Sequence, residues 1–186
     1  MDLKEEKELV EREKKDKEAF GEIYDRYYSP IFNYSLKRTA NVKVAQDVTS
    51  EVFFKALKNL WKFRWQSVSL SSWLYRIASN EICDHYRKNK KYISLDMMVE
   101  GGNFDPAGVT DLHAEYMESQ EKLAEHRDFL KIQKAISGLP DKYQEVLALK
   151  YFEKKKINEI SEIMGIKEGT IKSLIHRGLE KIRQEM

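Results

Sequence analysis

One short segment, 167-KEGTIKSLIHRG-178, carries side chains that could hydrogen-bond to an anionic polymer. They are two cations, a hydroxyl group and an imidazole: Lys172, Arg177, Ser173 and His176. At about 100° per residue these groups fall on one side of a helix, and the apolar residues Ile171, Leu174 and Ile175 fall on the other. Cations and hydroxyl groups in this arrangement reach phosphates and base edges. The segment is therefore predicted to be a helix with one buried side and one side that contacts a nucleic acid.

The residues that lead into this segment have the spacing of a helix-turn-helix: Ile160, Ser161, Met164, Gly165, Ile166, Ile171 and Leu174. Gly165 can adopt the left-handed conformation of the turn, and the small Ser161 lies where the two helices approach. In such units the second helix enters the major groove of duplex DNA. The pattern predicts a DNA-binding unit, and a helix hairpin in an ordinary bundle is the alternative.

Charge is distributed unevenly along the 186 residues, although the net charge is only +2. Residues 94–129 contain nine Asp or Glu against Lys122 and Arg127, whereas residues 1–93 and 150–186 each carry an excess of Lys and Arg. A polyanionic partner for the two basic parts would account for this asymmetry. Solvated helix surfaces would account for it equally well, so charge alone does not decide.

The sequence gives little sign of an enzyme. Its four histidines lack metal-ligand spacing, it has no glycine-rich phosphate loop, and Cys83 has no evident activating partner. A run of 18 apolar residues is absent, and the charged N-terminal segment lacks the apolar region of a signal peptide. We expect a cytoplasmic protein with no catalytic residues, no cofactor, no metal and no membrane insertion.

Apolar residues recur at three- and four-residue steps through most of the chain, which predicts helices. The predicted helices cover residues 20–34, 43–63, 73–91, 123–136, 141–152, 157–164 and 168–183, and residues 3–18 read as a surface helix or a frayed arm. In the helix over 43–63, Leu57 is predicted to lie on the apolar, buried side. Segment 100-EGGNFDPAGVTD-111 interrupts the pattern with glycine and proline. We predict an all-α fold of two small helical domains, residues 1–93 and 118–186, joined by an acidic flexible linker over residues 94–117.

Three motifs, in this order, carry a family resemblance: 45-AQDVTSEVFFKAL-57, 73-WLYRIASNEICDHYRK-88 and 157-INEISEIMGIKEGTIKSLIHRGLEKIR-183. Together they resemble the bacterial RNA polymerase sigma factors of the sigma-70 family, extracytoplasmic-function (ECF) group. The resemblance implies a sigma region 2 bundle followed by a sigma region 4 helix-turn-helix, and a role in transcription initiation and its regulation through promoter recognition. A stand-alone helix-turn-helix regulator, which typically binds a palindrome as a dimer, is the alternative.

For the first domain, the resemblance implies that it clamps the coiled coil of the polymerase β′ subunit and holds the −10 element open. The implied polymerase-binding residues are Asp47, Ser50 and Glu51, with Ser50 in place of the usual Gln. The implied −10 residues are Phe63, Arg64, Trp65, Arg76, Asn80, Arg87 and Lys88. Trp65 could stack on an unpaired base or anchor the core, and the cations suit phosphates.

For the second domain, the resemblance implies that Lys172, Ser173, His176 and Arg177 contact the −35 element and that the domain sits on the β flap. Two residues depart from the family pattern: Lys167 replaces a common Ser cap, and Leu174 replaces a frequent Arg. The linker is implied to thread through core RNA polymerase, although its composition also fits a plain tether. An anti-sigma factor is a further partner that the resemblance implies.

Overall fold

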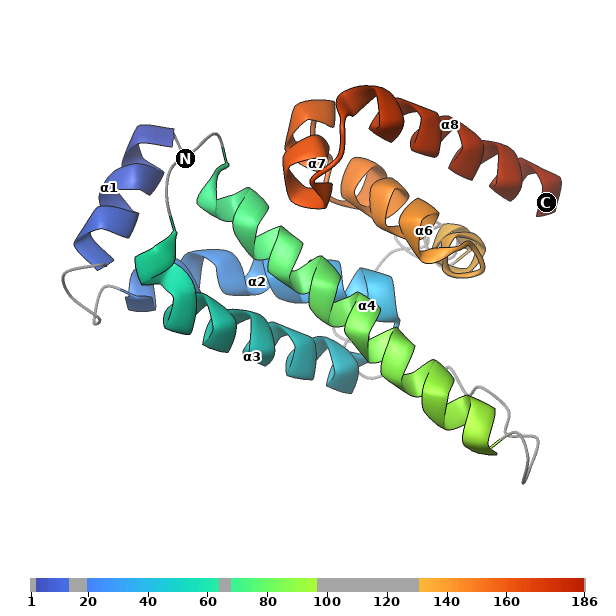
Figure 1. The fold of residues 1–186 in the computed structure, drawn as a ribbon, viewed down its shortest axis with the longest axis horizontal. Helices are drawn as coiled ribbons and strands as arrows, with labels where there is room; N and C mark the ends of the chain where they lie inside the picture. The colour runs from blue at the N-terminus through green and yellow to red at the C-terminus, as the bar shows by residue number, and fades with distance from the viewer. Residues whose placement is uncertain (1–2, 14–19, 64–67, 97–130, 186) are drawn as a thin grey trace, which may run out of the picture.

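The structure, a computed structural model, describes residues 3–13, 20–63, 68–96 and 131–185 (Figure 1). Its helices are α1 (Leu3–Glu13), α2 (Phe20–Thr39), α3 (Val42–Asn59), the 3-10 helix η2 (Leu60–Lys62), α4 (Leu70–Asp96), α6 (Asp141–Leu147), the π-helix η4 (Ala148–Phe152), α7 (Ile157–Met164) and α8 (Glu168–Glu185). Residues 131–137 are also helical, and the described residues contain no strand. The prediction of an all-α fold is confirmed. Within the described part of the chain, no helix is long and apolar enough to cross a membrane.

The first half of the chain is a bundle of α2, α3 and α4, with α1 packed on α2. Asn41 ends the turn before α3 and accepts a hydrogen bond from the backbone N–H of Val44 at 3.0 Å, which caps the helix. Fully buried aliphatic side chains such as Ile31, Val52 and Leu74 fill the centre of the bundle. Figure 1 shows α4 crossing the α2–α3 pair, and this long helix holds several candidate site residues.

The second half contains the predicted helix-turn-helix, formed by α7 and α8. Gly165 has a φ of 69°, the left-handed conformation that the turn requires, and the Ser161 hydroxyl donates to the carbonyl of Ile166 at 2.6 Å. α8 packs closely on α6, because a Cβ atom added at Gly178 would lie 3.0 Å from a methyl carbon of Leu147. These contacts bury one side of α8 and leave the other side exposed.

The two halves share one continuous hydrophobic cluster, which the sequence did not predict. α7 packs on α4, and η4 packs on α2. In Figure 1, α6 and α7 lie beside α4 on the side away from α3. The predicted linker, residues 94–117, falls almost entirely outside the described residues, as does the predicted helix start near residue 123.

Candidate nucleic-acid interface

The four polar residues predicted for α8 lie together on its exposed side. Lys172, Ser173, His176 and Arg177 are all exposed, whereas Ile171 on the opposite side is completely buried. Ser173 donates to the carbonyl of Gly169 at 3.0 Å, and His176 lies 3.3 Å from the Glu180 carboxylate one turn on. Among the described residues, Lys172 and Arg177 form no ion pair. Their charges are therefore open to an anionic partner.

The two departures from the family pattern have local explanations. The carbonyl of Lys167 accepts hydrogen bonds from the N–H groups of Thr170 and Ile171, so Lys167 stands at the start of α8 without a capping hydroxyl. Glu168 supplies an acidic group in the first turn, where the helix dipole favours it. Leu174 is half-buried against the hydrophobic cluster, so this position faces the protein more than the solvent.

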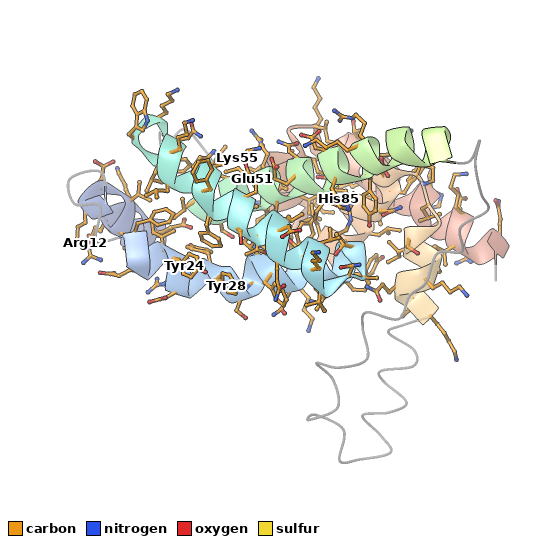
Figure 2. The ribbon with its side chains drawn as sticks, turned by 90° about the horizontal axis from the view of Figure 1, so that it is seen from below. Arg12, Tyr24, Tyr28, Glu51, Lys55 and His85 are labelled. Carbon is orange, nitrogen blue, oxygen red and sulfur yellow. The ribbon has the colours of Figure 1, made fainter. Side chains whose placement is uncertain are left out.

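The predicted polymerase-binding residues form an acidic strip on α3. Asp47 and Ser50 are exposed and Glu51 is half-exposed, all on adjacent turns of one side of the helix. Glu51 lies 3.5 Å from Lys55, which in turn pairs with Glu81 of α4 at 2.5 Å. Figure 2 shows Glu51 and Lys55 next to each other on α3. The strip thus remains open at Asp47 and is partly neutralised at Glu51.

An exposed apolar stripe continues this strip, and the sequence analysis missed it. Phe54 is 59% exposed, Leu57 48% and Trp61 68%. Leu57 was expected on the buried side of its helix, and that prediction is wrong. The three residues follow one another at steps of three and four, a second apolar period beside the one that forms the core. We refer to Phe54, Leu57 and Trp61 as the apolar stripe.

The predicted −10 residues separate into different environments. Phe63 is only 6% exposed and packs against Trp73 at 5.2 Å between ring centroids, so its ring is part of the core and does not face solvent. Arg64 and Trp65 lie outside the described residues. Asn80, Arg87 and Lys88 are exposed on α4.

Asn80 and Arg87 line a cleft of about 450 Å³ between α3 and α4. Lys55 and Asn59 face them from α3, and Trp73 and Glu81 complete the wall on the α4 side. The Arg87 guanidinium also lies 3.1 Å from Asp84. Lys55 and Asn59 were not predicted as site residues. They follow Glu51 at four-residue steps, and this spacing is the only sign in the sequence that the three residues share one side of the helix. The cleft combines amide, cationic and aromatic groups, the kinds that bind unpaired nucleotides.

Arg76 was expected to be a free cation that binds phosphate, but its side chain is hydrogen-bonded within the protein. Its guanidinium donates from Nε to the carbonyl of Ile163 at 3.0 Å and from Nη2 to the carbonyl of Glu162. These carbonyls belong to the last turn of α7, where backbone acceptors have no partner within the helix. Arg76 thus caps the first helix of the helix-turn-helix and joins the two halves.

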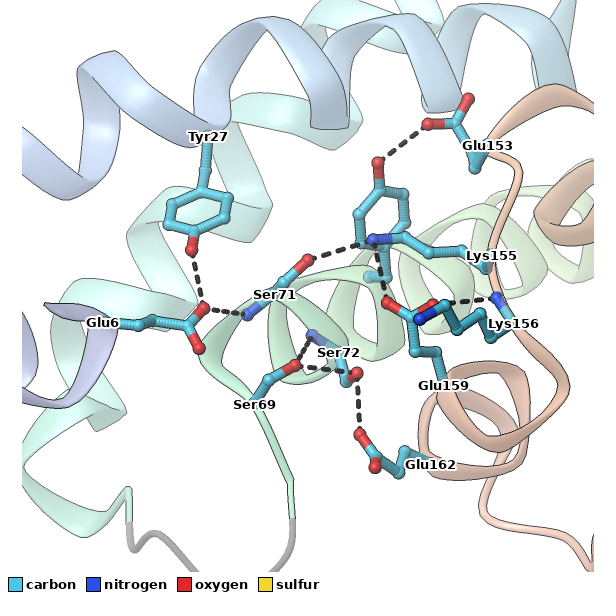
Figure 3. A network of polar contacts seen from close by, with 11 residues as sticks. Glu6, Tyr27, Ser69, Ser71, Ser72, Glu153, Lys155, Lys156, Glu159 and Glu162 are labelled. Carbon is cyan, nitrogen blue, oxygen red and sulfur yellow. Dashed lines mark hydrogen bonds and ion pairs between the residues drawn. The ribbon is translucent and has the colours of Figure 1, made fainter. Parts of the chain in front are cut away.

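A polar network surrounds this junction at the start of α4 (Figure 3). Glu6 of α1 accepts hydrogen bonds from the Tyr27 hydroxyl at 2.6 Å and from the Ser71 N–H at 3.0 Å. From the other half, Glu162 accepts from the Ser72 hydroxyl at 3.0 Å, and Lys155 donates to the Ser71 hydroxyl at 3.2 Å. The first turn of α4 is therefore held from two sides.

A second group of contacts joins the halves farther along α2. The Glu153 carboxylate accepts from Lys37 at 3.1 Å and from the Tyr75 hydroxyl at 2.8 Å. Burial, reinforced by the Glu153 charge, raises the pKa of Tyr75 well above its ordinary value. Gln133 also donates to the carbonyl of Lys37 at 2.9 Å. The packing of the halves is thus polar as well as apolar.

Comparison with known proteins gives matches over both halves. The family model described as Sigma-70 region 2 matches residues 23–92, and that described as Sigma-70, region 4 matches residues 129–182. The ECF RNA polymerase sigma factor SigW of Bacillus subtilis is 34% identical, over 100% of this chain and 98% of its own. The RNA polymerase sigma-H factor of Pseudomonas aeruginosa is 31% identical, over 94% and 90%.

Two solved structures have a similar fold. CnrH, in complex with the cytosolic domain of CnrY, gives a TM-score of 0.67 at 16% identity, over 96% of this chain and 95% of the other. The sigma factor RpoE of Bartonella quintana, in complex with the anti-sigma factor NepR, gives 0.63 at 18% identity, over 89% and 94%. At these identities the likeness concerns the fold, and it extends over both halves of the chain.

Proposed function

The chain belongs to the ECF group of the sigma-70 family of RNA polymerase sigma factors, and from this premise we propose how its residues engage the polymerase and the promoter. Members of the family direct promoter-specific transcription initiation together with core RNA polymerase, so core enzyme and promoter DNA are the partners. The phosphodiester chemistry belongs to the core enzyme. No catalytic residue is therefore assigned to this chain.

The surface proposed for the β′ coiled coil is the exposed side of α3. Asp47, Ser50 and Glu51 supply the acidic strip, and the apolar stripe extends it. Exposed large apolar groups next to charges are typical of protein interfaces, in which aromatic residues contribute much of the binding free energy. This combination suits a partner helix that carries both cations and apolar side chains.

The surface proposed for the opened −10 element is the α4 side of the cleft. Asn80, Arg87 and Lys88 are exposed there and can contact bases and phosphates of an unpaired strand. Phe63 is assigned a supporting role instead, because it packs against Trp73. Arg64 and Trp65, which lie outside the described residues, keep their proposed roles at the −10 element. While the halves are packed, two donors of Arg76 are held by the α7 carbonyls, so we expect its full contact with DNA only after the halves separate.

The surface proposed for the −35 element is the exposed side of α8. Lys172, Ser173, His176 and Arg177 point away from the core on the second helix of a helix-turn-helix, the helix that enters the major groove. The second half as a whole is the part proposed to sit on the β flap. The exposed side of α8 is the single observation that supports promoter reading most strongly.

We expect the halves to separate when the promoter is bound. The −10 and −35 elements are named for their positions, which are about 25 base pairs apart. This separation is roughly 85 Å along B-DNA at 3.4 Å per base pair. The longest helix among the described residues, α4, has 27 residues and spans only about 40 Å. A packed arrangement in which α7 contacts α4 is therefore too short to place both surfaces on their elements at once.

An anti-sigma factor is proposed as an alternative partner of the same surfaces. The support is the apolar stripe, which an inhibitor could cover, and a related fold that is solved with an anti-sigma factor. The polymerase works in the cytoplasm, which is the location proposed for this chain. An inhibitor would compete with core RNA polymerase, so the two bindings should exclude each other.

The test of this function is reconstitution with bacterial core RNA polymerase. A fluorescently labelled chain should bind core enzyme, and the mixture should start transcripts that core enzyme alone does not make. Asp47→Arg should weaken core binding at least tenfold, whereas the same change at Asp25, which is also an exposed acid but lies on α2, should not. If the chain ignores core enzyme but binds a palindromic duplex as a dimer, it is a stand-alone regulator instead.

A further inference from the structure

Glu6 belongs to a segment of alternating charges, in which a buried side chain is unusual. Its side chain lies on α1 and the residue is only 5% exposed. A buried carboxylate is costly unless hydrogen bonds compensate it. One oxygen, Oε1, accepts both the Tyr27 hydroxyl of α2 and the Ser71 N–H of α4 (Figure 3). A single carboxylate oxygen thus joins three helices.

The Ser71 N–H is one of the donors that a helix cannot satisfy by itself. Ser71 is the second residue of α4, and the first four N–H groups of a helix have no intrahelical acceptor. The Ser69 hydroxyl accepts the N–H of Ser72 at 3.0 Å, so the local sequence supplies one cap. Glu6 supplies another from a position 65 residues away. A carboxylate at this end also interacts favourably with the dipole of the 27-residue helix.

α1 is anchored well enough for Glu6 to act as a fixed point. Leu9 and Val10 are buried in the hydrophobic cluster, and Arg12 pairs with Glu22 of α2 at 2.8 Å. Burial, reinforced by the hydrogen bond to Glu6, raises the pKa of Tyr27 above its ordinary value, so its hydroxyl remains a donor. Glu6 is thereby held by α1 and α2 while it holds α4.

The contacts on the opposite side of this turn come from the other half of the chain. Lys155 and Glu162 bind the hydroxyls of Ser71 and Ser72 only while the halves are packed. Once the halves separate on a promoter, both of these contacts are lost. The Glu6 contact remains, because α1, α2 and α4 all belong to the first half.

We infer that Glu6 is a positioning residue for promoter opening: by fixing the first turn of α4 it sets where Asn80 and Arg87 meet the unpaired −10 strand. The inference rests on the proposed function, which places these two residues at the −10 element. Glu6 touches no DNA itself. Its effect should therefore be seen in promoter opening and not in the binding of core enzyme by α3 or of duplex by α8.

The test compares three variants in holoenzyme on a template that the wild-type holoenzyme has selected from a randomised pool. Glu6→Ala removes both hydrogen bonds, Glu6→Gln keeps an acceptor oxygen without the charge, and Glu8→Ala removes an exposed acid of the same helix. Open complexes are counted by permanganate reactivity of unpaired thymines, and core affinity is measured by fluorescence anisotropy on the same samples.

Glu6→Ala should lower the open-complex equilibrium about tenfold, a change that the loss of hydrogen bonds to a charged group can produce, with core affinity within twofold. Glu6→Gln should recover most of the loss, and Glu8→Ala should match the wild type. Equal losses of open complexes and core affinity would overturn the inference in favour of a merely structural role, as would a Glu6→Ala variant that opens normally. If the wild type itself opens no template, the proposed function fails instead.

Discussion

The Nε atom of Arg76 donates a hydrogen bond to the carbonyl oxygen of Ile163 at 3.0 Å, and this bond ties the long helix of the first half to the helix-turn-helix of the second. Arg76 was predicted to bind DNA phosphates. The α7 carbonyls already accept hydrogens from Nε and Nη2 of this guanidinium, which leaves it fewer of its five N–H donors. We therefore expect packing of the halves and DNA binding to compete for Arg76.

This bond predicts a stability effect for Arg76→Ala. Removing the guanidinium leaves the last carbonyls of α7 without their hydrogen-bond donor, so the free energy of unfolding should fall by about 2 kcal/mol. Arg87→Ala is the matched control, since Arg87 is exposed and, within the described part of the chain, forms an ion pair only with Asp84; it should change that free energy by less than about 0.5 kcal/mol. Urea unfolding followed by circular dichroism measures both, and equal effects would contradict the assignment.

The close approach of α6 and α8 predicts opposite effects for two glycines of α8. Gly178→Val would press its methyl groups against the fully buried Leu147 and should destabilise the fold by ~1–3 kcal/mol. Gly169→Ala meets nothing within 4 Å, and because alanine favours helix it should stabilise by ~0.5–1 kcal/mol. The midpoints of thermal unfolding of the two variants test this prediction. A Gly178→Val variant as stable as the wild type would show that α6 and α8 can move apart freely.

Tyr34 predicts a loss of stability in alkaline solution. Burial raises the pKa of Tyr34 to about 12 from an ordinary value near 10, against the opposing influence of Arg38 and with a smaller contribution from Glu145. Below pH 10 both folded and unfolded chains keep the proton. Between pH 10 and about 12 the unfolded chain releases it first, so the free energy of unfolding falls as pH rises.

Tyr34→Phe should make that decline shallower. The variant loses the hydrogen bonds that the Tyr34 hydroxyl forms with Ser79 and with the Arg38 guanidinium, about 1 kcal/mol each at neutral pH, but it has no proton to release in this window. Urea unfolding at several pH values across the window measures the slope. The pKa of Tyr75 is also raised, so a residual slope is expected. An unchanged slope would show that Tyr34 does not contribute to it.

The apolar stripe predicts a binding defect without a folding defect. Trp61→Ser removes a ring that is mostly exposed, so the midpoint of thermal unfolding should barely change. If the stripe contacts core RNA polymerase, the dissociation constant should rise about tenfold or more, as for other interface tryptophans. Ile132→Ser, an exposed apolar residue of the second half, serves as the control. Equal affinities of the two variants would remove the stripe from the interface.

The sequence predicted local features well and contacts between distant segments poorly. The Gly165 turn and the two sides of α8 depend on residues within one or two helical turns, so periodicity is enough to find them. Glu6 and Arg76 looked like surface charges, because their partners lie far away in the sequence. Leu57 was expected in the core because the apolar stripe lies next to the core residues on the same helix. A step of one residue there decides whether a side chain is buried or faces the solvent, and periodicity does not resolve it.

The central claim, that the exposed side of α8 reads one promoter element while the first half reads another, can be tested on a pool of templates with randomised upstream DNA. Holoenzyme should enrich two sequence blocks, near −35 and near −10. With Lys172→Ala and Arg177→Ala combined, the −35 block should vanish and the −10 block persist; Lys181→Ala, half a turn round the helix from Lys172, should keep both. Loss of both blocks together, or a −35 block unchanged by the double variant, would contradict the account.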